Sequence, residues 1–176
     1  MSLHPDFPRS PYAPLLPEQR WFPADETMRA TAYEKLLPPL VAKIREEVHA
    51  WRATGYLGAS DTSRALMRHW FEEEHLIENS DSSLSQFRYY FAQREAVETG
   101  IWLYEVRRTR DKFDLLRFDA SGSVSSGMFD EDWPRYVVKM ATGAGKTKVI
   151  SLLLAWSFFH KLYEPDSLHK RAISQC

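Results

Sequence analysis

The sequence lacks several features on which whole classes of protein depend. Its 176 residues include one cysteine, Cys176, which excludes an internal disulfide and a thiol cluster for zinc. Its 23 basic and 24 acidic side chains give a net charge of −1, so the chain lacks the overall positive charge that by itself would indicate nucleic-acid binding. The longest apolar stretch, residues 149–159, has 11 residues and is too short for a membrane span, and the N-terminus lacks a secretory signal pattern. We therefore expect a soluble, cytoplasmic protein with no membrane partner.

Proline is abundant at the start of the chain. It recurs at every third position, in Pro5, Pro8, Pro11, Pro14 and Pro17. This spacing matches the three-residue turn of polyproline II. We predict that residues 1–32 form an extended arm laid across the body of the protein. A ligand for a proline-binding module is the alternative.

Residues 33–106 have the pattern of a helical region. After Pro38-Pro39, apolar residues at helical spacing predict a first helix that stops near Gly55. The "SDTS" segment, residues 60–63, predicts a second helix after it, with Glu72–Glu74 on a solvated face. The "ENSDSSLS" segment, residues 78–85, breaks that helix, and a third helix is predicted over about residues 92–106.

The pattern changes after the third helix. Residues 107–134 mix charge with glycine and serine, which predicts a hairpin or a solvated insertion. Residues 135–140, "RYVVKM", then predict a short buried strand. The helix after the next glycines is apolar nearly all round, so we expect it to be buried on several sides. Residues 135–176 are therefore predicted to hold a strand, a glycine loop and a helix.

The glycine loop has the composition of a phosphate-binding turn, and its residues are Thr142, Gly143, Ala144, Gly145, Lys146 and Thr147. Consecutive backbone amides that enter a helix N-terminus give a phosphate many short hydrogen bonds, and glycines let the backbone curl close to the anion. Lys146 would reach the β and γ phosphates, and the Thr147 hydroxyl would complete the shell of a magnesium ion. An ordinary glycine turn is the alternative. The strict phosphate-loop pattern also asks for glycine at the position of Met140.

Four segments, in order, resemble one protein family. "MATGAGKT", residues 140–147, resembles motif I of superfamily-two DEAD/DEAH-box helicases of the type III restriction-enzyme kind. "FAQREAVETGIWLYEV", residues 91–106, is similar to the glutamine motif of that family. Residues 49–70 and the arm segment 10–25, "SPYAPLLPEQRWFPAD", are similar to the family's upstream segments.

This resemblance implies an α/β fold in which the arm and the helical region lead into the start of a RecA-like P-loop NTPase domain. It implies ATP and magnesium as cofactors and ATP-driven unwinding or translocation of DNA. DNA would be a partner, together with a methylase or restriction subunit.

The resemblance also assigns Gln93 as the residue that reads adenine. A primary amide holds a donor and an acceptor in fixed geometry, so it can bond both N6 and N7 of adenine, a pairing that guanine would mismatch. Gln93 would then select ATP. The alternative is that Gln93 is a helix-start residue whose side chain bonds the backbone.

Splitting ATP by this scheme needs a second carboxylate on a later strand, a residue that orients water and an arginine from a second lobe. None of these follows Thr147, and the acidic "FDED" of residues 129–132 precedes the loop. We therefore expect an incomplete RecA-like domain, from a shortened chain, that binds ATP without turning it over. The alternative is a non-catalytic remnant or interaction module, in which residues 33–106 bind a partner and the loop is idle.

Overall fold

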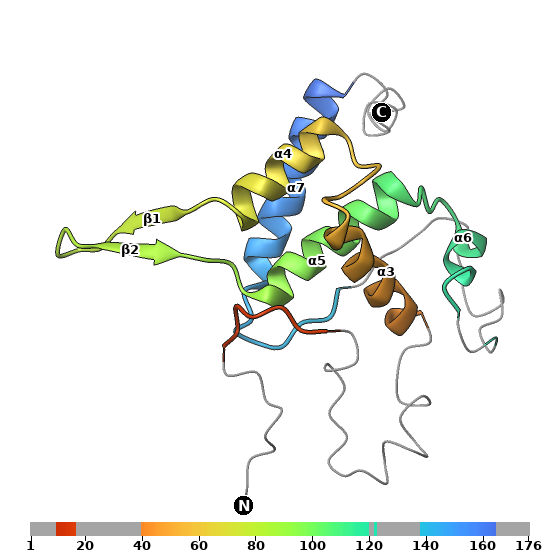
Figure 1. Cartoon of the computed structure of the whole chain (residues 1–176), viewed down its shortest axis with the longest axis horizontal. Helices are drawn as coiled ribbons and strands as arrows, with labels where there is room; N and C mark the ends of the chain where they lie inside the picture. Colours follow the sequence, from red (N-terminus) through yellow and green to blue (C-terminus); the bar gives the residue numbers. More distant parts are fainter. Residues whose placement is uncertain (1–9, 17–39, 120–121, 123–137, 165–176) are drawn as a thin grey trace, which may run out of the picture.

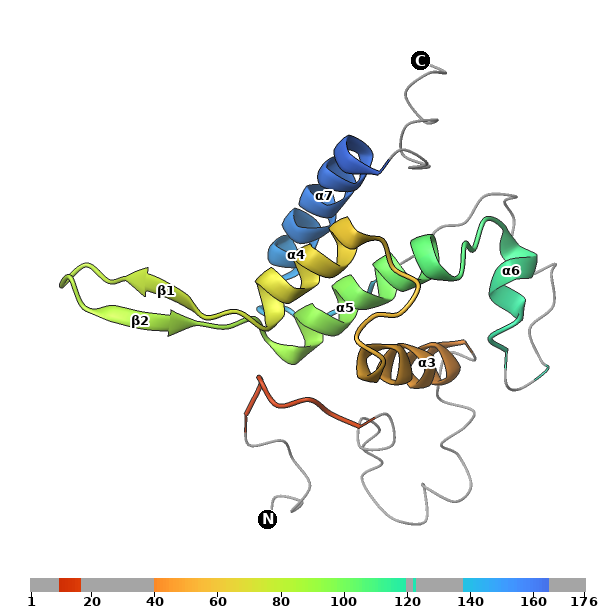
Figure 2. The ribbon, with the colours of Figure 1, turned by 45° about the horizontal axis from the view of Figure 1, so that its top comes forward.

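The structure is a computed structural model that describes residues 10–16, 40–119, 122 and 138–164. Its elements are α3 (Val41–Ala53), α4 (Asp61–Phe71), β1 (His75–Glu78), β2 (Leu84–Phe87), α5 (Phe91–Ile101), the π-helix η2 (Trp102–Val106), α6 (Lys112–Leu116) and α7 (Lys146–Tyr163). The strands pair as an antiparallel hairpin that projects from the helices in both Figure 1 and Figure 2.

The first two predicted helices are confirmed. Helix α3 ends where Gly55 adopts a φ of +66°, and the Gly55 and Tyr56 amides donate to carbonyls of the last turn. Helix α4 begins at Asp61, inside the "SDTS" segment, because the Ser60 hydroxyl accepts from the Ser63 amide at 3.2 Å. It ends at Phe71, so Glu72–Glu74 are exposed as predicted but lie beyond the helix.

The hairpin was not predicted. The segment expected only to break the second helix contributes the hairpin's turn, in which the Asn79 amide donates to the Ser83 carbonyl at 2.8 Å. The Asp81 carboxylate accepts from the Ser83 hydroxyl and from the Ser83 amide, the latter at 3.0 Å; both bonds favour the turn and lower the pKa of Asp81. Leu76 and Leu84 are more than half exposed. Neither strand has a buried face. The sequences of both strands therefore lack the alternation of apolar and polar residues that marks a half-buried strand.

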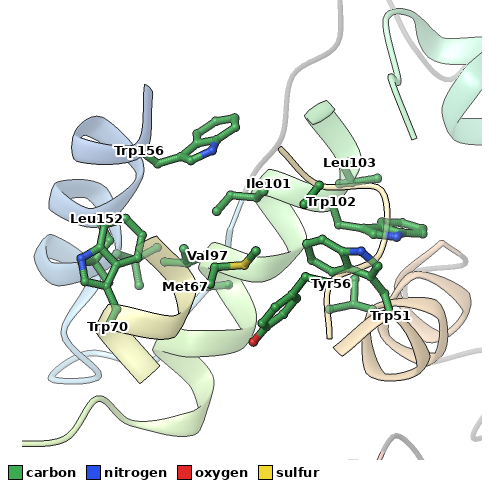
Figure 3. Packing of buried hydrophobic residues seen from close by; sticks show 14 of the residues in the cluster. Trp51, Tyr56, Met67, Trp70, Val97, Ile101, Trp102, Leu103, Leu152 and Trp156 are labelled. Atoms are coloured by element: carbon green, nitrogen blue, oxygen red, sulfur yellow. The ribbon is translucent and has the colours of Figure 1, made fainter. Parts of the chain in front are cut away.

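Helix α5 lies at the centre of the core. It packs against α3, α4 and α7. Figure 3 shows Val97 and Ile101 of α5 between the side chains of α4 and α7 on one side and those of α3 on the other. Trp51, Trp102 and Trp156 are each at most 6 % exposed in this cluster. The third predicted helix is confirmed, with η2 as its last turn.

The burial of helix α7 differs from the prediction. It was expected to be buried on several sides, but only one side is buried, through Val149, Leu152, Trp156 and His160. Ile150, Leu154, Phe158 and Leu162, four residues apart, are each at least 55 % exposed. No helix within the described ranges has the length and apolarity to cross a membrane.

The segment that begins at residue 107 also differs from its prediction. Residues 107–119 form no hairpin but contain α6, and they place Leu115 and Phe118 in the core at 7 % and 1 % exposure. Most of the predicted insertion beyond residue 119 lies outside the described residues. The predicted strand 135–140 is not part of any strand at 138–140, and its first half lies outside the described residues. Among the described residues the hairpin is the only sheet, so the RecA-like fold stays a prediction.

A buried carboxylate joins α3 to α5. Glu98 is fully buried, and its carboxylate accepts from Arg52 Nε at 2.9 Å, from Arg94 Nε at 2.8 Å and from the Tyr56 hydroxyl at 2.7 Å. Burial raises the pKa of Tyr56, and the Glu98 carboxylate raises it further. The hydroxyl therefore stays protonated and continues to donate.

Replacement of this carboxylate should destabilise the protein strongly. Glu98→Ala removes the buried carboxylate that pairs with the partly buried Arg52 and Arg94 and leaves Arg94 only the more distant Glu72, so we expect a loss of about 3 to 5 kcal/mol in urea unfolding. Glu46→Ala is the control, because it removes an exposed ion pair with Lys43 and should cost at most about 0.5 kcal/mol. Equal losses in the two variants would contradict this assignment.

A second carboxylate joins η2 to α4 and α7. Glu105 accepts hydrogen bonds from the Ser60 amide and the Ser63 hydroxyl, and His160 Nε2 lies 3.7 Å from it. Trp156 Nε1 of α7 donates to the same Ser63 hydroxyl at 2.8 Å. Burial by itself would raise the pKa of Glu105, but the nearby His160 and the hydrogen bonds from Ser63 and Ser60 outweigh it, and the pKa lies below its usual value.

This lowered pKa predicts acid sensitivity. A carboxyl whose pKa is depressed by folding stabilises the protein above its unfolded pKa, about 4.3, and this stability is lost as the pH falls through the folded value. Glu105→Gln should therefore lower the free energy of unfolding at pH 7 and reduce its fall below about pH 4.3. Urea unfolding at several pH values tests this, and parallel pH curves for the variant and the wild type would refute it.

Candidate phosphate-binding loop

The glycine loop makes a tight turn into α7. The Ala144 amide donates to the Ala141 carbonyl at 3.2 Å, which closes the turn. Gly143 and Gly145 have φ values of +81° and +77°, in the left-handed region that side chains disfavour. The predicted glycines therefore stand where the backbone requires them.

The loop ends at the N-terminus of a long helix. Gly145 is the N-cap of the 18-residue α7, and within the described residues no side chain caps this end. The amides of a helix's first turn have no partner within the helix, and the helix dipole makes this end positive. Thr142, Gly143, Lys146 and Thr147 are all exposed here. The Thr147 side chain thus lies on the first turn, where the magnesium role requires it.

Lys146 folds back over the loop. Its ammonium group donates to the carbonyls of Met140 and Ala141, both at 3.0 Å. The cation is therefore held against the main chain at the start of the loop. Because Met140 takes part through its main chain, its departure from the glycine pattern leaves this contact intact.

Gln93 is brought to the loop from α5. Its Nε2 donates to the Ala144 carbonyl at 3.0 Å, and its Oε1 accepts from the Tyr90 amide at 3.0 Å. These partners fix the orientation of the amide. Rotating it by 180° would place its NH2 group against the Tyr90 N–H and its oxygen against the Ala144 carbonyl. A Cβ at Gly145 would lie 2.2 Å from Nε2, so any larger residue there would have to displace the Gln93 amide. The sequence assigned Gln93 and the loop to one site, and the structure places them in contact.

The two hydrogen bonds of Gln93 bear on whether it recognises adenine or is a helix-start residue that bonds the backbone. The bond to Tyr90 is the backbone bond that the alternative interpretation expects of a helix-start residue. Yet a primary amide has two donor hydrogens and two acceptor lone pairs, so these two bonds use one of each. Gln93 is 6 % exposed.

Other residues near this end of α5 and α7 were not singled out from the sequence. The Lys148 ammonium group lies 5.6 Å from the Phe87 ring at the base of the hairpin. A cavity of about 340 Å³ lies between segment 10–16, the end of α4, the hairpin and the start of α5. Tyr12 and Tyr89 are among the residues that line it, whereas Gln93 is not. No short-range pattern could reveal this cavity, because its walls come from four separate segments.

The two loop glycines should respond differently to substitution. Gly143→Ala meets no atom within 4 Å and should cost only the backbone strain, about 1 to 2 kcal/mol. Gly145→Ala must in addition displace the Gln93 amide, so we expect a further loss of about 1 kcal/mol in urea unfolding. In a Gln93→Ala background this difference should vanish, and its persistence there would contradict the steric explanation.

Comparisons with known proteins do not add to this geometry. No family model, no curated protein and no solved structure matches the chain. The family resemblance of the four segments is therefore a prediction from the sequence.

Proposed function

We propose that residues 142–147 bind the phosphates of Mg-ATP. The observation that carries this proposal is the pair of left-handed glycines leading into the uncapped N-terminus of α7, with Lys146 held over the same turn. Backbone amides, a helix dipole and a fixed cation together are what a triphosphate needs for recognition. Thr147 would contribute its hydroxyl to the magnesium ion.

Gln93 would select the base. Its remaining amide hydrogen can donate to N7 of adenine, and its remaining lone pair can accept from the N6 amino group. The bonds to Tyr90 and Ala144 support this role, because they hold the amide in one orientation before the nucleotide arrives.

The wider proposal is that the chain is the ATP-binding N-terminal part of a DNA helicase or translocase of the restriction-enzyme type. It rests on the four segments that resemble this family. DNA and a methylase or restriction subunit would then be partners of the whole enzyme. A cytoplasmic location accompanies the proposal, since the single cysteine fits a reducing compartment.

We propose that this chain by itself binds ATP without hydrolysing it. Hydrolysis requires a second carboxylate near the magnesium ion. The first acidic residue after Thr147 is Glu164, which lies past the end of the 18-residue α7, about 27 Å from the loop at 1.5 Å per residue. The Glu164 carboxylate accepts there from the Thr62 amide at 3.1 Å.

The second candidate is an interaction module in which the loop is idle. The exposed apolar face of α7 favours it, because apolar patches on a surface mark contacts with partners. Under this proposal the chain would not bind nucleotide.

Calorimetric titration separates the two candidates. The wild-type chain should bind ATP in the presence of magnesium, and Lys146→Ala should weaken binding by at least about tenfold because it removes a charge-assisted contact. Lys43→Ala, which changes an exposed lysine of α3, should bind like the wild type. Phosphate release should stay at background in all three chains. Absence of magnesium-dependent binding by the wild type would leave the interaction module in its place.

A further inference from the structure

Segment 10–16 of the N-terminal arm contacts the first residues of α5. The Pro11 carbonyl accepts a hydrogen bond from the Phe91 amide at 2.9 Å. The Tyr12 and Tyr90 rings lie 5.4 Å apart between centroids, and the Arg88 guanidinium group lies 5.4 Å from the centre of the Tyr12 ring. In Figure 1 this segment, coloured red, passes the end of α5 that carries Gln93. Segment 10–16 thus contacts the helix at its first turn.

The start of α5 needs partners from outside the helix. The first amides of a helix have no acceptor within it, and Phe91 is only 5 % exposed. The arm supplies the acceptor for the Phe91 amide, and Gln93 supplies the acceptor for the Tyr90 amide at 3.0 Å. The first amides of α5 therefore find their acceptors in segment 10–16 and in the Gln93 side chain of the same turn.

These contacts continue to the phosphate-binding loop. Tyr90 packs against Tyr12 with its ring and holds the Gln93 amide with its backbone. Gln93 in turn holds the Ala144 carbonyl. Glutamine has three side-chain torsions, so the position of its amide depends on these neighbours. A shift of Tyr90 would move the amide that faces the loop.

We infer that segment 10–16 is a positioning element of the nucleotide site, and that Tyr12 is its main positioning residue. By fixing the first turn of α5 it fixes the Gln93 amide, and it thereby sets the affinity for the adenine base rather than for the phosphates. This inference rests on the proposed function. Tyr12 acts through Tyr90 and Gln93 and needs no contact with the nucleotide.

The experiment compares two ligands on the full chain. Calorimetry measures the affinity for ATP and for inorganic tripolyphosphate, both with magnesium. Tyr12→Ala should weaken ATP binding by about fivefold, the value of one aromatic pair, and should change tripolyphosphate binding by less than about twofold. Tyr12→Phe keeps the ring and should bind both ligands like the wild type. Tyr163→Ala, an exposed tyrosine at the far end of α7, is the matched control.

A double-mutant cycle tests the route through Gln93. In a Gln93→Ala background, Tyr12→Ala should cause no further loss of ATP affinity, because the amide that it positions is gone. Amide exchange followed by NMR gives a readout without nucleotide, in which Tyr12→Ala should speed exchange at Phe91. Arg88→Ala removes the cation beside Tyr12 and is a second, milder variant. It too should weaken ATP binding more than tripolyphosphate binding.

The outcomes separate the two levels of proposal. Failure of the wild type to bind ATP overturns the proposed function, and this inference with it. ATP binding that Tyr12→Ala leaves unchanged, or weakens equally for ATP and tripolyphosphate, overturns the positioning role and leaves the proposed function standing. A Tyr12 effect that persists in the Gln93→Ala background overturns it as well.

Discussion

The hydrogen bond from Gln93 to the Ala144 carbonyl holds the glycine loop against the helical core. It joins residues 51 positions apart, and its donor comes from the buried α5 at the centre of the fold. Gly145 permits the contact because it has no Cβ, which would lie 2.2 Å from the amide nitrogen. The loop is therefore located relative to the core by a side chain, and everything inferred about phosphate and base recognition depends on that attachment.

The sequence predicted those parts of the fold that local chemistry determines. Apolar residues at helical spacing gave α3 and α5, and the residues 60–63 cluster gave the start of α4, because capping and periodicity act over a few positions. The glycines of the loop were identified for the reason that the structure gives them, a backbone that needs positive φ. The contact of Gln93 with the loop was implied by the family resemblance alone, since nothing local connects residues so far apart.

The parts that the sequence did not predict depend on tertiary partners or on the absence of a buried face. The hairpin has exposed strands, so no alternation marks it. Glu98 and Glu105 look like solvated charges, yet Glu98 is fully buried and Glu105 is partly buried, and each accepts hydrogen bonds from residues distant in the sequence. One available sign was that Glu98 lies between Val97 and Ile101 on an apolar stretch, four residues after Arg94. Residues 112–118 interleave charged and apolar side chains, and only the packing reveals that Leu115 and Phe118 enter the core whereas Phe113 is exposed.

Helix α7 has nearly equivalent apolar character on opposite sides. Turning it about its axis would replace Val149, Leu152 and Trp156 at the core with the exposed apolar residues Ile150, Leu154 and Phe158. Such a turn would leave the Trp156 N–H and the His160 ring without Ser63 and Glu105. These polar contacts at one end of the helix therefore favour the observed side over the opposite one. The rotational setting of α7, and with it the direction of its first-turn amides, thus depends on contacts far from the loop as well as on the bond from Gln93 to Ala144.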